Sequence, residues 1–285
     1  MESNLESEPV IELFSIGTEL TLGQIQDTNA HWIAQQTFQL GGTIRRISMI
    51  RDDFDEMKEA IQDSIEHRQT GLVITTGGLG PTPDDMTVEI IAEIIGKDLV
   101  VDQNTVQNYM ERRQLRDRSE VGEALVKMAT VPETAVVFQN PVGWAPCISV
   151  EVKQSTLVMM PGPPREMQAV FENHIAPIIS KRFSAAGSSI RIYVDLHESG
   201  VSPLMQQVME KFPNVYVKAY VALRETDRGM PIDIITTSSS QDDVELLLQE
   251  SVNYFREIVT AQGNSFRIDT KQKNQSNVTG TRRKN

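Results

Sequence analysis

The spacing of apolar residues between positions 10 and 182 predicts alternating strands and helices. Apolar runs that stop at glycine, such as 10–16 and 71–76, are typical of buried strands, whereas 53–67 repeats apolar residues at helical spacing. Such alternation favours an α/β layered fold with a largely parallel sheet. The same pattern predicts further strands at 43–50, 134–138, 147–152 and 156–160, helices at 27–38, 86–95 and 165–181, and a less distinct helical stretch from 97 to 128.

A second, smaller pattern follows at 189–262. It predicts a β-α-β-β-α unit with strands at 190–196, 215–223 and 231–238 and helices at 202–212 and 242–260. The sequence SAAGSS at 184–189 is a linker composition, so we expect a first domain at 10–183 and a small α+β domain at 189–262. The C-terminal tail, residues 263–285, offers only Phe266, Ile268 and Val278 as apolar anchors. We expect this tail to be disordered and dispensable.

The charge of the chain is unevenly distributed. The formal net charge is −12, but residues 263–285 hold six Lys/Arg and one Asp, so the tail carries +5 and the body −17. A body this acidic repels phosphate backbones, and we expect no nucleic-acid partner. An anionic small molecule would need a metal ion or backbone N–H groups to hold it.

Several other classes of protein are disfavoured. No apolar run approaches the length of about 20 residues that spans a bilayer, and residues 1–9 lack the pattern of a signal peptide. A single cysteine, Cys147, and four scattered histidines argue against a disulfide framework and a Cys/His zinc site. We therefore expect a cytoplasmic protein without a membrane partner.

The segment from Thr75 to Thr87, TTGGLGPTPDDMT, carries the most chemistry. It joins a strand to a helix at the edge of the sheet where α/β proteins bind ligands. Its glycines allow a tight turn that points N–H groups at an anion, and adjacent Asp84 and Asp85 suit a divalent metal. The alternative is an ordinary glycine-rich turn in which Asp84 or Asp85 caps the helix.

The segment from Gly17 to Asn29, GTELTLGQIQDTN, makes a second strand-to-helix connection, with Glu19 as a carboxylate for a metal or a base. A polar turn with a helix cap is the alternative. NPVGWAP at 140–146 is a turn in which Trp144 either stacks on a base or belongs to the core. PGPPREM at 161–167 is a rigid turn that begins a helix.

These four motifs, in this order, resemble the amino-terminal domain of the competence/damage-inducible CinA family, which is similar to the molybdopterin-binding MoaB/MogA-type fold. The resemblance covers about residues 10–262. It implies a three-layer α/β/α domain followed by the small domain, a homodimer, and metal-dependent hydrolysis of the pyrophosphate in ADP-ribose-like or FAD-like nucleotides. Full-length members also carry a nicotinamide mononucleotide deamidase domain, and we expect that activity to be absent here.

On this hypothesis Asp84, Asp85 and Asp52 hold Mg²⁺, Mn²⁺ or Co²⁺, and Glu19 positions or deprotonates the attacking water, with Asp85 the second catalytic candidate. Asp52 could equally belong to a helix cap. The remaining ligand-binding candidates are Gly17, Thr18, Asn29, Thr76, Gly77, Gly78, Gly80, Thr82, Thr87, Asn140, Gly143, Pro161 and Gly162.

Two other functions stay open. One is a molybdopterin-type domain that binds a pterin phosphate or transfers a nucleotidyl group with the same anion cradle. The other is a binding module that has kept the fold and lost turnover, because 125–129 (LVKMA) departs from the family's usual Asn-Arg-Arg/Lys-Gln-Ala run.

Overall fold

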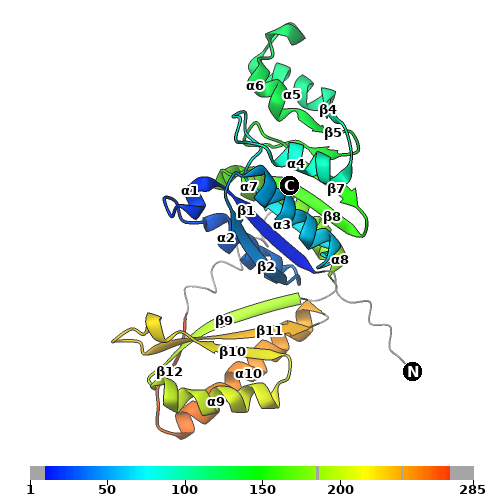
Figure 1. The fold of residues 1–285 in the computed structure, drawn as a ribbon. Helices are drawn as coiled ribbons and strands as arrows, with labels where there is room; N and C mark the ends of the chain where they lie inside the picture. Colours follow the sequence, from blue (N-terminus) through cyan, green and yellow to red (C-terminus); the bar gives the residue numbers. More distant parts are fainter. Residues whose placement is uncertain (1–9, 184–185, 239, 270–285) are drawn as a thin grey trace, which may run out of the picture. The chain divides into compact units, whose positions relative to one another are not determined.

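The computed structural model describes residues 10–183, 186–238 and 240–269. They divide into two compact units, with the boundary after Phe183; residues 38–41 are grouped with the C-terminal unit. Figure 1 shows the elements of each unit along the chain. Each unit has its own sheet.

The N-terminal unit is built on a six-stranded sheet with the order β2-β1-β3-β8-β7-β6. Strands β2, β1, β3 and β8 are parallel, while β7 and β6 run antiparallel to their neighbours, so the prediction of a largely parallel sheet is confirmed. The strands are β1 (Ile11–Ile16), β2 (Ile44–Ile50), β3 (Leu72–Thr76), β6 (Val136–Phe138), β7 (Cys147–Val152) and β8 (Ser155–Met160).

Helices cover both faces of this sheet, which is why every residue of β1, β3 and β8 is buried. On one face Phe14 and Val73 pack against Ile61 of α3 and Ile91 of α4. On the other, Ile11 meets side chains of α2 and α8 around Gly42. The helices are α1 (Thr18–Thr21), α2 (Thr28–Gln39), α3 (Phe54–Glu66), α4 (Thr87–Ile95), α7 (Pro164–Val170) and α8 (Ala176–Arg182), with a π-helical turn η2 (Phe171–Ile175) between the last two.

The stretch expected to be helical before residue 128 folds into a separate lobe. This lobe comprises β4 (Leu99–Val101), α5 (Gln103–Arg113), η1 (Arg118–Glu120), α6 (Glu123–Met128) and β5 (Thr130–Pro132). Strands β4 and β5 pair antiparallel. A small core of Val106, Tyr109, Val121, Leu125 and Ala129 holds the helices together. The helix prediction was therefore incomplete, because it missed the two three-residue strands that close the lobe.

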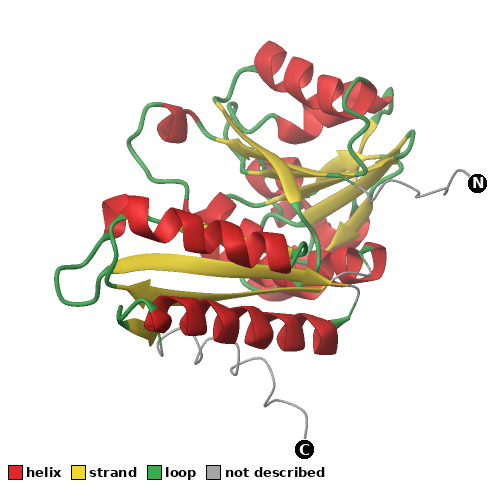
Figure 2. Ribbon diagram, turned by 90° about the horizontal axis from the view of Figure 1, so that it is seen from below, coloured by secondary structure: helices red, strands yellow, loops and turns green. Residues whose placement is uncertain are grey.

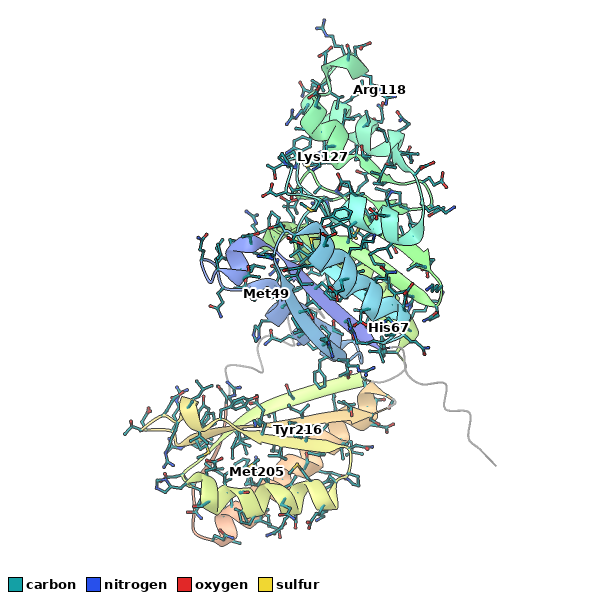
Figure 3. The ribbon with its side chains drawn as sticks, viewed as in Figure 1. Met49, His67, Arg118, Lys127, Met205 and Tyr216 are labelled. Carbon is teal, nitrogen blue, oxygen red and sulfur yellow. The ribbon has the colours of Figure 1, made fainter. Side chains whose placement is uncertain are left out.

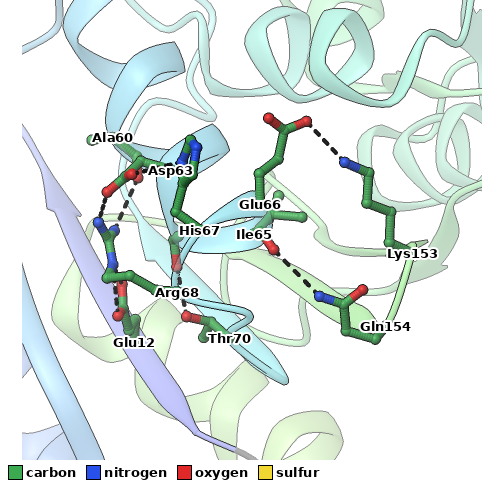
Figure 4. Close-up of polar contacts among 11 residues, drawn as sticks. Glu12, Ala60, Asp63, Ile65, Glu66, His67, Arg68, Thr70, Lys153 and Gln154 are labelled. Atoms are coloured by element: carbon green, nitrogen blue, oxygen red, sulfur yellow. Dashed lines mark hydrogen bonds and ion pairs between the residues drawn. The ribbon is translucent and has the colours of Figure 1, made fainter.

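A buried ion pair lies under α3 (Figure 4). Glu12 on β1 is fully buried, and Arg68 Nε lies 2.9 Å from both of its carboxylate oxygens. Arg68 also contacts Asp63 and donates to the Ala60 carbonyl, so its guanidinium has an ion-pair partner and a hydrogen-bond acceptor besides Glu12. A buried carboxylate is tolerated only when it is paired in this way.

The C-terminal unit is an antiparallel sheet with the order β10-β11-β9-β12 and two long helices along it (Figure 2). Its core includes Ile192, Val217, Ile232 and Phe255. The elements are β9 (Ala186–Val194), α9 (Glu198–Lys211), β10 (Val215–Ala219), η3 (Val221–Leu223), β11 (Met230–Ser238), α10 (Gln241–Ala261) and β12 (Phe266–Ile268).

Strand β12 lies in the segment that was predicted to be a disordered tail. Phe266 and Ile268 pair with Val194 and Ile192 of β9 and pack against the core of the unit. The expectation of disorder from residue 263 onward is therefore wrong for 266–268, and the small domain extends past residue 262. Part of that prediction, residues 270–285, lies outside the described residues.

Candidate functional site

A cavity of about 660 Å³ opens where three parallel strands of the N-terminal unit end. Its walls include Gly17 after β1, Gly77 to Gly80 after β3, and Pro161 to Pro164 after β8. Its volume lies in the range of small-molecule sites. Parallel strands bring their carboxyl ends to one edge, so three motifs that are distant in sequence line one space.

The loop after β3 depends on glycine at two positions. Gly77 and Gly78 have φ values of +100° and +67°. A Cβ atom on Gly77 would lie 2.3 Å from the Ile16 carbonyl oxygen, and one on Gly78 would lie 2.1 Å from Thr87 Oγ1. Both positions therefore need glycine, in agreement with the tight turn that the sequence predicts.

Free N–H groups gather in this loop. The Gly77 N–H donates to the Met160 carbonyl at 3.0 Å, so it is not available to a ligand, contrary to the sequence-based expectation. In the part of the chain that the structure describes, the N–H groups of Gly78, Leu79 and Gly80 have no hydrogen-bond acceptor. Three successive free donors are the arrangement that binds phosphate oxygens in other loops.

Helix α4 is joined to the back of this loop. The Thr87 hydroxyl donates to the Gly77 carbonyl at 3.0 Å, and the Thr87 N–H donates to the Gly78 carbonyl at 3.2 Å. The residue at the N-cap of α4 is Met86, which provides no side-chain hydrogen bond. The alternative in which Asp84 or Asp85 caps this helix is therefore wrong.

Asp84 and Asp85 converge on one hydroxyl group. Thr82 Oγ1 lies 2.6 Å from Asp85 Oδ2 and also contacts Asp84 Oδ1, and the Thr82 N–H donates to Asp85 Oδ2 at 2.9 Å. A hydroxyl has one proton, so it satisfies only one of the two carboxylates at a time. The hydrogen bond from Thr82 lowers the pKa of Asp84 below its ordinary value.

Glu19 and Asp52 have different roles in the wall. Asp52 Oδ2 accepts from the Thr18 N–H at 2.7 Å and from Thr18 Oγ1 at 2.9 Å, so it caps α1, while Asp53 caps α3. The Glu19 carboxylate has no hydrogen-bond or ion-pair partner among the described residues. Its carboxylate fills the space where a Gly17 side chain would stand, 2.6 Å from that Cβ position.

Asn29 connects α2 to the loop after β8. Its Nδ2 donates to the Gly162 carbonyl at 2.7 Å, which fixes the orientation of the amide. Its Oδ1 is buried without a hydrogen-bond partner. A buried unpaired acceptor beside a cavity is costly, and a bound donor would relieve that cost.

Asn140 and Gly143 support the wall from behind. Asn140 is buried, donates to Ala145 and Glu166, and accepts from the N–H groups of Val142 and Gly143. Its hydrogen-bonding capacity is therefore used within the protein, which argues against the expected ligand contact. Gly143 has no room for a side chain because the Glu166 carboxylate lies against it.

The lining of the cavity is strongly acidic. It contains six carboxylates, and in the described part of the chain no Lys, Arg or His side chain joins them. An anionic ligand would be repelled by such a wall unless cations entered with it. The six are Glu19, Asp27, Asp52, Asp84, Asp85 and Glu166.

A metal ion fits part of the predicted ligand set. No three His, Cys, Asp or Glu side chains among the described residues lie close enough to surround an ion, so Asp52 does not join Asp84 and Asp85 in one cluster. Two converging carboxylates suffice for Mg²⁺ or Mn²⁺ when ligand phosphates and water complete the shell. The fit therefore rests on Asp84 and Asp85.

The structure brings most of the candidate residues to one place. The cavity is lined by Gly17, Glu19, Asn29, Asp52, Thr76, Gly77, Gly78, Gly80, Asp84, Asp85, Pro161 and Gly162. The other five are not part of the lining: Thr18, Thr82, Thr87, Asn140 and Gly143. Sequence reasoning missed Leu79, Met128 and Glu166, and left Trp144 undecided. Glu166 belongs to the PGPPREM motif at 161–167. Its place in that motif is the signal that could have identified it as a cavity residue.

Comparison with known proteins agrees with this fold. Residues 12–181 match a family model described as a probable molybdopterin binding domain. A protein from Pyrobaculum calidifontis is 32% identical over 257 residues, which cover 89% of this chain and 97% of that protein. A competence-damage inducible protein from Natranaerobius thermophilus is 34% identical over 82% of this chain, which spans 55% of that longer relative.

A solved structure also matches the N-terminal unit. The crystal structure of a CinA protein of unknown function from Thermoplasma acidophilum is 32% identical, with a TM-score of 0.54, and the match covers 60% of this chain and 99% of that one. The fold and the family match define an α/β domain of the probable molybdopterin binding family. The chain belongs to this family and within it to the CinA-like proteins. No helix in the described ranges is both long and apolar enough to cross a bilayer.

Proposed function

We propose that the cavity binds a nucleoside diphosphate derivative together with a divalent metal ion and hydrolyses its phosphoanhydride bond. The observation that carries this proposal is the combination of three free loop N–H groups with a wall of six carboxylates. The N–H groups of Gly78, Leu79 and Gly80 attract phosphate oxygens. The acidic wall requires that the negative charge of the ligand be compensated by a cation.

The roles of the carboxylates follow from their hydrogen bonds. Asp84 and Asp85 would hold the ion, and a bound divalent metal polarises a phosphoryl oxygen and lowers the pKa of water. Glu19 lines the same cavity and its carboxylate has no partner among the described residues, so the carboxylate oxygens are free to accept a proton from the attacking water. Asp52 orders α1, and hence Glu19, because it caps that helix through Thr18.

A direct assay tests the proposal. Purified protein is incubated with ADP-ribose or FAD, with Mn²⁺ or Co²⁺ and with EDTA, and release of AMP is measured. We expect metal-dependent AMP release that EDTA abolishes. Asp85→Asn should abolish turnover while circular dichroism and the melting temperature stay near those of the wild type. Wild-type turnover in Asp85→Asn would contradict its assignment as a metal ligand.

A second function is favoured by one specific observation. The family model describes a molybdopterin-binding domain, and the buried Asn29 Oδ1 beside the cavity can accept a hydrogen bond from a pterin N–H. Tight binding of a pterin phosphate without AMP release from either nucleotide would favour this reading. The homodimer implied by the family stays a prediction.

A further inference from the structure

Three side chains of the lobe donate to backbone carbonyls of the cavity wall. Lys127 Nζ lies 2.6 Å from the carbonyl oxygens of both Thr82 and Asp85. The Tyr109 hydroxyl donates to the Trp144 carbonyl at 2.6 Å, and Arg112 donates to the Gly143 carbonyl. The lobe thus supports two separate segments of the wall, and Lys127 alone contacts the segment that carries the paired aspartates.

The contact of Lys127 spans the acidic turn from end to end. The carbonyls of Thr82 and Asp85 are the two ends of the four-residue turn that contains Asp84. Fixing a carbonyl fixes its peptide plane, because the peptide unit is rigid. One ammonium group therefore holds two peptide planes of the turn at once. Apart from those of Lys127, the hydrogen bonds of this turn within the described part of the chain are all among Thr82, Asp84 and Asp85.

The position of the ammonium also matters electrostatically. Lys127 does not line the main cavity; it lines a small neighbouring cavity that Gly78, Gly80 and Asp85 line as well. Its nearest carboxylate partner, Glu89 Oε1, is 3.8 Å away, beyond hydrogen-bond distance. A positive charge bound to the backbone of this turn reduces the mutual repulsion of its two adjacent carboxylates without forming a hydrogen bond to either of them.

The side chain is supported by the lobe core. Lys127 belongs to α6, and Figure 3 shows it closer to the rest of the N-terminal unit than Arg118 is. Leu125 of the same helix is buried among Val106, Tyr109 and Ala129. The packing of the lobe therefore determines where the ammonium group lies.

We propose that Lys127 is a positioning residue that holds the Thr82–Asp85 turn in the conformation that receives the metal ion. This inference rests on the proposed function, since it assigns the metal to Asp84 and Asp85. The lobe then has a definite role, because it carries the group that fixes the metal-binding turn. Replacing such supporting groups around metal ligands commonly weakens metal affinity by about 10- to 100-fold.

The test compares Lys127→Met and Lys127→Arg with a matched control, Lys97→Met. Lys97 is also partly exposed and forms an ion pair with Glu133 at 3.2 Å, but it makes no contact with the turn. Mn²⁺ affinity is measured by calorimetry on the whole chain. Hydrogen exchange of residues 79–86 is measured separately without metal, and the melting temperature reports general stability.

We expect Lys127→Met to weaken Mn²⁺ binding by about 10-fold or more and to speed exchange in residues 79–86. Lys127→Arg should recover part of the affinity, because a guanidinium also donates to two carbonyls. Lys97→Met should match the wild type in both measurements. If Lys127→Met does not fold, Lys127→Gln replaces it, since an amide can still donate to one of the carbonyls.

The outcomes separate this inference from the proposed function. Wild-type affinity and wild-type exchange in Lys127→Met would overturn the positioning role. A loss of affinity that merely follows a lower melting temperature, equally in Lys97→Met, would also overturn it. If the wild-type protein binds no Mn²⁺, the metal assignment fails, and the exchange of residues 79–86 alone then decides whether Lys127 holds the turn.

Discussion

Arg68 is a residue whose removal should strongly destabilise the N-terminal unit. Its guanidinium neutralises Glu12, which is fully buried on a central strand. Removing one partner of a buried pair leaves an uncompensated charge and costs about 3–5 kcal/mol. Arg68→Met should therefore lower the free energy of unfolding by about that amount, measured by urea denaturation.

The control for Arg68 lies in the same region of the fold (Figure 4). Lys153 pairs with Glu66 at 2.8 Å, but both side chains are largely exposed, at 55% and 37%. Exposed pairs contribute between zero and about 1 kcal/mol, so Lys153→Met should change stability little. If the two substitutions lowered the free energy of unfolding equally, burial would not determine how much the Glu12–Arg68 pair contributes to stability.

Gly78 should tolerate a side chain far less well than a glycine with similar backbone geometry. Gly78 and Gly96 both have positive φ, +67° and +64°. A Cβ at Gly78 would lie 2.1 Å from Thr87 Oγ1, whereas a Cβ at Gly96 would meet no atom within 4 Å. Gly96→Ala should lower the free energy of unfolding only by the backbone strain of about 1 kcal/mol, and Gly78→Ala should lower it clearly more.

Gly78→Ala should also weaken ligand binding beyond its effect on stability. The loop must shift to accommodate the new methyl group, and the free N–H groups of Gly78 to Gly80 shift with it. Calorimetric titration of ADP-ribose at fixed Mn²⁺ concentration measures the change against folded Gly96→Ala. Unchanged affinity in Gly78→Ala would place the phosphate site elsewhere.

At the scale of elements, β12 should be required for the stability of the C-terminal unit. A chain that ends at Gln262 loses the half-buried Phe266 and Ile268, which pack on the core and pair with β9. Losing two half-buried apolar side chains costs about 2–3 kcal/mol. We expect a clearly lower melting temperature for this chain, whereas a chain that ends at Asp269 should melt near the full-length value. Equal melting temperatures would contradict the docking of β12.

Long periodic elements were predicted well, whereas of the three-residue strands in the described residues only β6 was predicted. Helices α3 and α10 have apolar faces that repeat over 13 and 21 residues, so their pattern is unambiguous. Strands β4, β5 and β12 have three residues each, too few for any period to be recognised. They exist because a partner strand lies beside them, and partner strands cannot be identified from local pattern alone.

For the whole molecule, metal and ligand together should stabilise the N-terminal unit specifically. A ligand present at about 100 times its Kd stabilises the folded state that binds it by about 2.7 kcal/mol. We expect Mn²⁺ with ADP-ribose to raise the melting temperature more than either alone, and to leave hydrogen exchange in β9, β10 and β11 unchanged. An equal increase in Asp85→Asn would indicate that the metal binds somewhere else.

The sequence by itself determined the class of the fold and most of the residues around the cavity. Strands β1, β3 and β8 end just before Gly17, Gly77 and Pro161, so their ends can be recognised from the local sequence. Parallel strands must bring those ends to one edge of the sheet. The positive φ of Gly78 follows from the same local reasoning. The four motifs also identified the family, because their order and residue types are specific to it.

Only the tertiary structure decided which of those residues face the cavity and which support it. Asp52 and Asp85 are both aspartates after strands, but Asp52 caps α1 from a neighbouring loop while Asp85 shares a hydroxyl with Asp84. Lys127 reaches the turn from a helix about 40 residues later in the chain. Such roles depend on distances between segments that are far apart in sequence, and local patterns contain no information about those distances.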